Sequence, residues 1–200
     1  LTLLGTSPDP VDGVACIDPR TSPKLATYTD AFFELRKHKG ISRAGAEAAI
    51  LDPLGFAAMM VREGDADGTI GGATHTTSDV VRTALQIIGR APDVEVVSSY
   101  FLMLIDSGTR PIVFADCGLV LQPSAEELAS IAIASSASLT AMTGLQPKVA
   151  LLSFSTKGSV PQGAHESLGR IARALALVND HAPDLARPAG FHGAAGAHSG

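Results

Sequence analysis

The stretch VEVVSSYFLMLIDSGTRPIVFAD, residues 94–116, decides the fold class. Its first half, residues 94–105, is largely apolar, as in a strand that is buried on both faces of a sheet. Residues 106–110 contain Asp, Ser and Gly, which predicts a hairpin turn into a second strand at residues 111–115. The hairpin therefore adds an antiparallel pair to whatever sheet the chain forms.

Helix and strand patterns alternate after this hairpin. Ser124 and Glu127 have the spacing of a capping box, which predicts a helix that runs to about Met142. Residues 149–154 are apolar and predict another strand.

The same alternation precedes the hairpin. Short apolar runs at residues 11–18 and 68–73 predict strands, and Pro23 and Pro53 predict the first positions of two helices. This order indicates an α/β fold with a mostly parallel sheet and flanking helices, which the hairpin makes mixed.

The domain organisation follows from breaks in composition. Ala-Pro-Asp at residues 91–93 predicts a boundary between two lobes, a first α/β domain over residues 1–92 and a second over residues 93–185. Residues 186–200 hold four Gly and five Ala without a periodic apolar face, which is typical of a disordered tail.

Composition excludes several classes of protein. An apolar share of 46% excludes a disordered chain, and a net charge of −5 argues against a nucleic-acid partner. The uncharged residues 128–147 are rich in Ala, Ser and Thr and predict a buried helix rather than a membrane span. Two cysteines in 200 residues suggest a reducing compartment, so we expect a cytoplasmic protein.

The stretch GGATHTTSDVVR, residues 71–82, has the composition of a phosphate-binding turn. Its glycines let the backbone approach a ligand, and the helix that follows offers N–H groups and a partial positive charge. Hydroxyl groups and an arginine one helical turn further on add donors. The alternative is an ordinary capped helix. The candidate residues are Thr74, His75, Thr76, Thr77 and Arg82.

Two further segments are candidates for anion binding. In residues 152–159 an expected strand ends in hydroxyls, a cation and a glycine, where ligands of open α/β sheets bind; the alternative is a polar loop. Its candidates are Ser155, Thr156, Lys157, Gly158 and Ser159. In residues 34–40, Arg36 can bind phosphate through its planar guanidinium, or the basic residues there can simply stabilise a helix C-terminus.

Other reactive residues carry weaker signals. Asp116 and Cys117 follow an expected strand, but no base accompanies the cysteine, so a buried structural thiol is the preferred interpretation. The histidines lack the spacing of metal ligands, so we expect no metal site.

Eight motifs together resemble the phosphate acetyltransferase/phosphate butyryltransferase family, over residues 2–185. They are DPRTSP (18–23), ELRKHKG (34–40), GDADG (64–68), GATHTT (72–77), RTALQII (82–88), FADC (114–117), AEELA (125–129) and LSFSTKGS (152–159). Residues 34–40 and 74–77 favour the acetyl branch over the butyryl branch.

The resemblance implies reversible acetyl transfer between acetyl phosphate and coenzyme A. It implies two α/β domains related to isocitrate and isopropylmalate dehydrogenases, with Arg36 and Arg82 as catalytic residues at a cleft between them. The turn at residues 74–77 and the loop at residues 155–159 then bind the acyl phosphate. Coenzyme A is a substrate here, and no cofactor is implied.

The resemblance also implies a longer chain at both ends and a homodimer at full length. Family members carry a late Asn-Asp-Leu-Ser-Arg-Gly motif with the base that deprotonates the thiol, and these 200 residues do not contain it. We therefore expect the phosphate half of the site without its base, so that Asp79 or Asp116 would have to replace it. The alternatives are a phosphate butyryltransferase, a related dehydrogenase, and a non-catalytic acetyl-CoA-sensing domain as in malic enzyme fusions.

Overall fold

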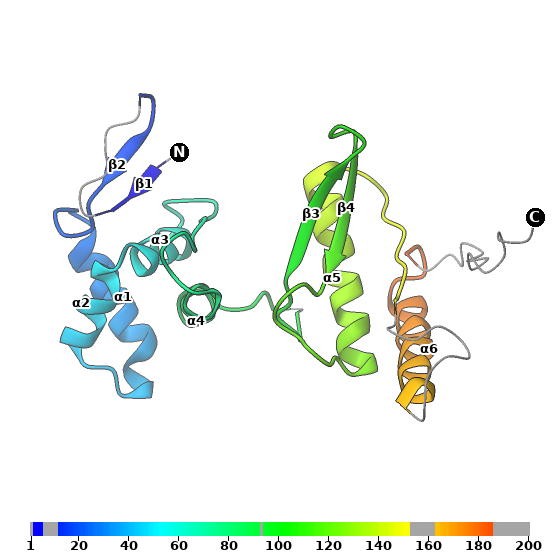
Figure 1. The fold of residues 1–200 in the computed structure, drawn as a ribbon. Helices are drawn as coiled ribbons and strands as arrows, with labels where there is room; N and C mark the ends of the chain where they lie inside the picture. The colour runs from blue at the N-terminus through cyan, green and yellow to red at the C-terminus, as the bar shows by residue number, and fades with distance from the viewer. Residues whose placement is uncertain (1, 6–11, 93, 153–162, 186–200) are drawn as a thin grey trace, which may run out of the picture. The chain divides into compact units, whose positions relative to one another are not determined.

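The structure is a computed structural model, and it describes residues 2–5, 12–92, 94–152 and 163–185 (Figure 1). The chain divides into two compact units, Leu1–Ala91 and Pro92–Gly200, and each is described by itself. The elements of the first unit are β1 (Thr2–Leu4), β2 (Ala15–Ile17), α1 (Leu25–Arg36), the 3-10 helix η1 (Lys37–Lys39), α2 (Arg43–Leu51), α3 (Pro53–Arg62) and α4 (Thr77–Ile87). Those of the second unit are β3 (Tyr100–Ile105), β4 (Arg110–Ala115), α5 (Ala125–Thr143) and α6 (Gly163–His181).

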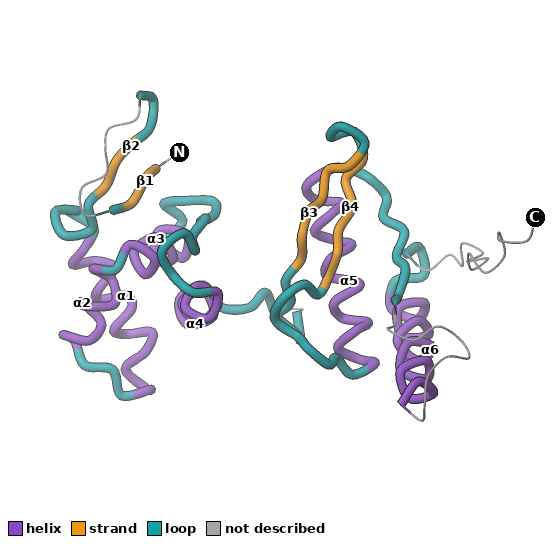
Figure 2. Tube along the Cα trace, in the orientation of Figure 1, coloured by secondary structure: helices purple, strands orange, loops and turns teal. Residues whose placement is uncertain are grey.

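The chain is mixed α/β, but its sheets differ from the expected one (Figure 2). Parallel pairing is confined to β1 and β2, with Leu3 opposite Cys16. The longer pair, β3 and β4, is antiparallel, with Met103 opposite Ile112. The hairpin prediction is confirmed, but β3 begins only at Tyr100 and its residues are mostly exposed, so the expectation of a strand buried on both faces is wrong. A mostly parallel sheet is not found among the described residues.

Two other expected strands are also missing from the described residues. Residues 68–73 are not a strand, and neither are residues 149–152, while residues 153–154 lie outside the described part of the chain. A strand exists only through hydrogen bonds to a neighbour, and neither segment has such a neighbour among the described residues. Apolar composition alone therefore overpredicted strands.

A side-chain cap starts α3 where the sequence places it, whereas α1 begins at Leu25, after the predicted Pro23, and its N-cap residue Lys24 makes no side-chain cap. Asp52 accepts a hydrogen bond from Leu54 N at 2.8 Å and Pro53 takes the first helical position, so α3 begins as predicted. Between α2 and α3 the backbone turns so tightly that a Cβ on Gly55 would lie 2.0 Å from the carbonyl oxygen of Ala49. Only glycine fits at this contact.

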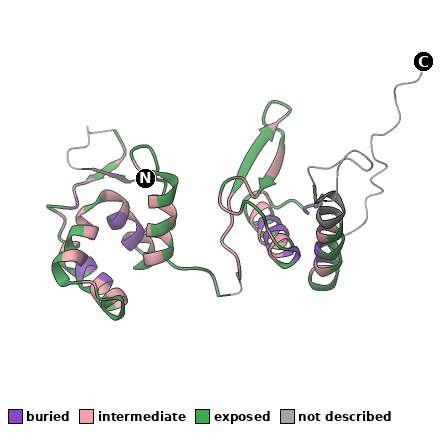
Figure 3. Cartoon of the chain, turned by 60° about the horizontal axis from the view of Figure 1, so that its bottom comes forward, coloured by how far each residue is buried: buried purple, intermediate pink, exposed green. Residues whose placement is uncertain are grey.

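The core of the first unit lies where α3 packs against α1, α2 and α4 (Figure 3). Tyr28 and Phe56 meet edge to face with ring centroids 4.9 Å apart. Ile50 and Met59 are fully buried beside them. Because α3 contacts both α1 and α4, it fixes the helices that carry Arg36 and Arg82.

A polar contact joins the start of α1 to the turn after α3. The hydroxyl of Tyr28 and the ammonium of Lys24 both donate hydrogen bonds to Asp65, with Lys24 Nζ at 2.9 Å. These hydrogen bonds hold the pKa of Asp65 below its ordinary value, and the bond from Tyr28 has the larger effect. Burial, together with the hydrogen bond to Asp65, raises the pKa of Tyr28.

In the second unit α5 packs against β4 and α6 packs against α5. Ser124 and Glu127 form the predicted capping box, and Gly144 ends α5 in the left-handed conformation. The buried contact between α5 and α6 includes Ala129 and Val178.

Candidate functional site

The turn before α4 is built around a reciprocal cap. The hydroxyl of Thr76 accepts a hydrogen bond from Asp79 N at 3.2 Å, and Asp79 Oδ2 accepts from Thr76 N at 3.3 Å. The Thr76 hydroxyl also lies 2.7 Å from Asp79 Oδ2. These hydrogen bonds from Thr76 are the main reason why the pKa of Asp79 is lowered, so this carboxyl is ionised at neutral pH.

The cap leaves two donors at the start of α4 unused. Within the described part of the chain, the N–H groups of Thr77 and Ser78 have no hydrogen-bond partner. The first N–H groups of a helix point out of its N-terminal end and carry a partial positive charge. Gly72, at φ +112°, brings the preceding backbone into the same turn in a conformation that other residues rarely adopt. The turn can therefore accept an anion.

Arg82 reaches back toward this helix start. Its guanidinium lies 3.4 Å from Asp79 Oδ1 and 3.3 Å from the hydroxyl of Ser78, and its side chain is 61% exposed. An exposed ion pair at this distance contributes little to stability. The guanidinium can therefore exchange Asp79 for a stronger anionic partner at small cost.

His75 connects the turn to the start of α3. Its Nε2 lies 3.3 Å from Asp52 Oδ2, and its Nδ1 lies 3.3 Å from the hydroxyl of Thr74. The imidazole is 28% exposed, whereas Asp52 is 48% exposed. Asp52 was not among the predicted site residues, because nothing in the sequence indicates its contact with a residue 23 positions away.

Arg36 is the last residue of α1 and is half-buried. In the described part of the chain its guanidinium has no hydrogen bond or ion pair. The neighbouring Lys37 pairs with Glu34, and Gly40 ends the basic segment at φ +81°. A half-buried guanidinium without a partner is suited to binding an anion.

The third candidate segment cannot be compared with the structure. Ser155, Thr156, Lys157, Gly158 and Ser159 lie outside the described residues.

Asp116 organises the loop after β4. Its Oδ1 accepts from the N–H groups of Gly118 and Leu119, each at 2.7 Å, and from Val120 N at 3.2 Å. Its Oδ2 accepts from Ser99 N at 2.7 Å. Burial raises the pKa of Asp116, but these hydrogen bonds outweigh it and the net shift is downward. A carboxylate held this way is a poor base.

Cys117, like Asp116, contacts Ser99. Its Sγ lies 3.4 Å from the hydroxyl of Ser99, and its N–H donates to Ser99 O at 3.3 Å. Within the described part of the chain its hydrogen-bonding partner is Ser99, not a cation or a histidine, so nothing beside the thiol activates it as a nucleophile.

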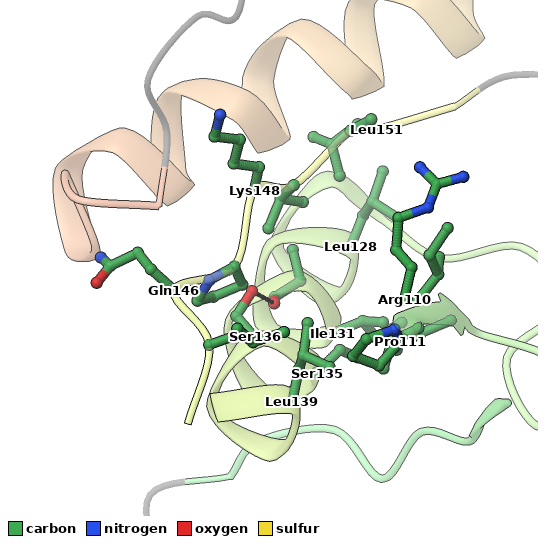
Figure 4. Close-up of a pocket in the computed structure, with 18 residues that line it drawn as sticks. Arg110, Pro111, Leu128, Ile131, Ser135, Ser136, Leu139, Gln146, Lys148 and Leu151 are labelled. Carbon is green, nitrogen blue, oxygen red and sulfur yellow. Dashed lines mark hydrogen bonds between the residues drawn. The ribbon is translucent and has the colours of Figure 1, made fainter. Parts of the chain in front are cut away.

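A pocket of about 470 Å³ lies between α5, β4 and residues 145–151 (Figure 4). One face of α5 contributes Ile131, Ser135 and Leu139, and β4 contributes Arg110 and Pro111. The lining is mostly apolar. Ser135 is 9% exposed, and its hydroxyl has no hydrogen-bond partner among the residues that the structure describes.

Among residues 2–5, 12–92, 94–152 and 163–185, no three His, Cys, Asp or Glu side chains come together as metal ligands. In that part of the chain no single helix could span a bilayer; α2 and α3 satisfy the length and composition test only as a pair bent by 98°.

The chain is thus an α/β protein in which hydroxyl side chains and Arg82 gather at the start of α4. Residues 8–190 match the model of the family described as phosphate acetyl/butaryl transferase. The chain belongs to this family.

Relatives and solved structures agree with the family match. The chain is 48% identical over 189 residues to a phosphate acetyltransferase of Paracoccus denitrificans, covering 92% of this chain and 58% of that protein. It is 43% identical to one from Thermoanaerobacterium thermosaccharolyticum, covering 85% and 52%. A phosphotransacetylase structure from Streptococcus pyogenes superposes with a TM-score of 0.72 at 36% identity, covering 88% and 52%. The chain thus spans about half the length of the relatives it matches.

Proposed function

We propose that this chain supplies the acyl-phosphate part of a phosphate acetyltransferase, which reversibly transfers an acetyl group between acetyl phosphate and coenzyme A. The observation that carries the proposal is the family match over residues 8–190, which includes the turn with two unused N–H groups and Arg82. The acetyl branch is preferred because relatives at 43–48% identity are phosphate acetyltransferases.

The proposed chemistry assigns a separate task to each group. The thiolate of coenzyme A attacks the acetyl carbonyl, the C–O bond to phosphate breaks, and phosphate leaves with the bonding electron pair. Arg36 and Arg82 are proposed to neutralise charge on the phosphate, and the N–H groups of Thr77 and Ser78 to donate hydrogen bonds to it. Each such donor contributes about 3–4 kcal/mol to the transition state. Deprotonation of the thiol is not assigned to Asp79 or Asp116, because their hydrogen bonds make them weak bases.

The remaining parts of the proposal concern location and assembly. Two cysteines in 200 residues support a cytoplasmic location. A homodimer of the full-length protein is supported by exposed apolar side chains on the hairpin, where Phe101 is 59% and Leu104 62% exposed.

Binding measurements on the 200-residue chain test the proposal. Acetyl phosphate and inorganic phosphate are titrated by NMR into the wild type and into Arg36→Gln and Arg82→Gln. We expect each substitution to weaken binding at least tenfold, since each removes a charge-assisted contact. Arg43→Gln is the matched control, because Arg43 pairs with Asp30 away from the turn. Equal affinity in all four proteins would refute the proposed site.

A further inference from the structure

His75 lies between two oxygen atoms of other side chains. Asp52 Oδ2 is 3.3 Å from Nε2, and the Thr74 hydroxyl is 3.3 Å from Nδ1. Asp52 is also fixed by its cap on α3, where Oδ1 accepts from Leu54 N. A continuous line of contacts therefore runs from the start of α3 to the turn before α4.

The chemistry of these atoms decides where the hydrogens lie. An ionised carboxylate only accepts hydrogen bonds, so Nε2 of His75 carries a hydrogen. A neutral imidazole has a single N–H, so Nδ1 is then an acceptor and takes the hydrogen of the Thr74 hydroxyl. In this state Thr74 presents lone pairs to its surroundings and cannot donate to an anion.

Protonation of His75 reverses the last contact. Nδ1 now carries a hydrogen and donates it to the Thr74 oxygen. The hydroxyl hydrogen of Thr74 is released and becomes available to an anion. The imidazolium also adds a positive charge beside the turn.

We infer that Asp52 is a positioning residue, which holds His75 so that binding of a phosphate-type dianion at residues 74–78 takes up one proton. The proton comes from solvent and forms the Nδ1–H bond of His75. By reciprocity, the bound dianion favours protonated His75 by the same factor as protonation favours the dianion. The inference rests on the proposed acyl-phosphate site and adds a proton-dependent step to it.

The charged groups that face His75 come from both neighbouring helices. On the α3 side the partner is Asp52. On the α4 side Asp79 is kept ionised chiefly by its hydrogen bonds from Thr76, and Arg82 pairs with Asp79. The partial positive charge at the start of α4 repels an imidazolium, and a bound dianion offsets this repulsion. Histidine is the side-chain type that ordinarily changes charge between pH 5 and 8.

Sulfate is used as the probe because it stays a dianion over the pH range in which phosphate itself titrates. Any pH dependence of sulfate binding therefore comes from the protein and not from the ligand. Its dissociation constant is measured by NMR on the 200-residue chain near pH 5.5 and near pH 8. We expect about tenfold tighter binding at the lower pH, the effect of one charge-assisted hydrogen bond. His75→Gln and Thr74→Val should both remove most of this dependence.

Two variants separate positioning from folding. Asp52→Ser keeps a good helix cap but cannot reach His75, so it should also lose the pH dependence. His38→Gln removes another histidine from the first unit and should retain it. The ring ¹⁵N signals of His75 give a second readout: near pH 8 the wild type should be the Nε2–H tautomer, and Asp52→Ser a mixture.

The outcomes distinguish this inference from the proposed function. Sulfate binding that does not depend on pH, or an Nδ1–H tautomer in the wild type, overturns the inference and leaves the phosphate site standing. A pH dependence that persists in His75→Gln overturns it equally. Failure of the wild type to bind sulfate at either pH overturns both.

Discussion

Replacing Asp116 by alanine tests how the loop after β4 is held. The carboxylate accepts hydrogen bonds from four backbone N–H groups, and the Ser99 hydroxyl adds a contact at 3.2 Å. The Ser99 and Leu119 donors are partly buried at 2.7 Å, whereas Gly118 is exposed and regains water. A hydrogen bond to a charged group contributes about 1.5–3 kcal/mol when shielded. Two such bonds, reduced by solvent access, predict a loss of about 2–4 kcal/mol.

The assay is urea unfolding followed by NMR signals of the second unit, at pH 7 and at decreasing pH. Because hydrogen bonds lower the folded pKa of Asp116, its contribution is complete above the unfolded pKa of about 3.9 and is lost as pH falls through the folded pKa. The wild-type and Asp116→Ala curves should therefore converge in acid. Asp106→Asn is the matched control, since asparagine tolerates the positive φ of 51° at this hairpin position. A loss at pH 7 no larger than that of the control would show that the Asp116 carboxylate does not hold this loop.

Four further substitutions test other parts of the structure, each by urea unfolding unless stated. Gly55→Ala should destabilise the protein by about 3 kcal/mol or more, because the new Cβ would collide with the carbonyl oxygen of Ala49. Gly169→Ala is the control and should be neutral or stabilising, because its Cβ would meet nothing within 4 Å. Equal effects of the two substitutions would contradict the close approach at Gly55. Ser135→Ala should stabilise by about 1 kcal/mol, because it removes a buried hydroxyl that has no partner in the described part of the chain, and a loss of stability would mean that a partner exists. Asp52→Ala should lower the free energy of unfolding by about 1 kcal/mol through loss of the α3 cap, whereas Asp52→Asn, which can still cap, should be near wild type. A larger loss in Asp52→Asn than in Asp52→Ala would exclude capping. Tyr28→Phe should raise the pKa of Asp65, measured from its carboxyl ¹³C shift, and an unchanged pKa would remove Tyr28 as the main cause.

Local signals in the sequence predicted local structure well. The capping box at the start of α5 depends on residues three positions apart, and the structure contains it. The similar box of Thr76 and Asp79 at the start of α4 was not predicted. The hairpin turn is equally local, and it places Asp106, Ser107 and Gly108 at positive φ. Pro53 started α3 as predicted, because proline favours the first helical position whatever the tertiary context.

Structure that depends on distant partners was predicted less well. Residues 43–51 were given no element although Ser42 caps α2 by accepting from Gly45 N. The expected strand at residues 149–154 has apolar side chains, but its described residues find no strand to pair with. In the site, the Asp52–His75 contact was missed for the same reason, since only tertiary packing brings the start of α3 to the turn before α4.

In the proposed site, Arg36 and Arg82 share one phosphate-type dianion with the start of α4. The side-chain ¹⁵N spectrum of arginine-labelled chain during a phosphate titration tests this sharing, with each signal assigned by its Gln variant. We expect the guanidinium signals of Arg36 and Arg82 and the amide signals of Thr77 and Ser78 to shift together with one dissociation constant. Shifts confined to one arginine, or two unrelated dissociation constants, would contradict it.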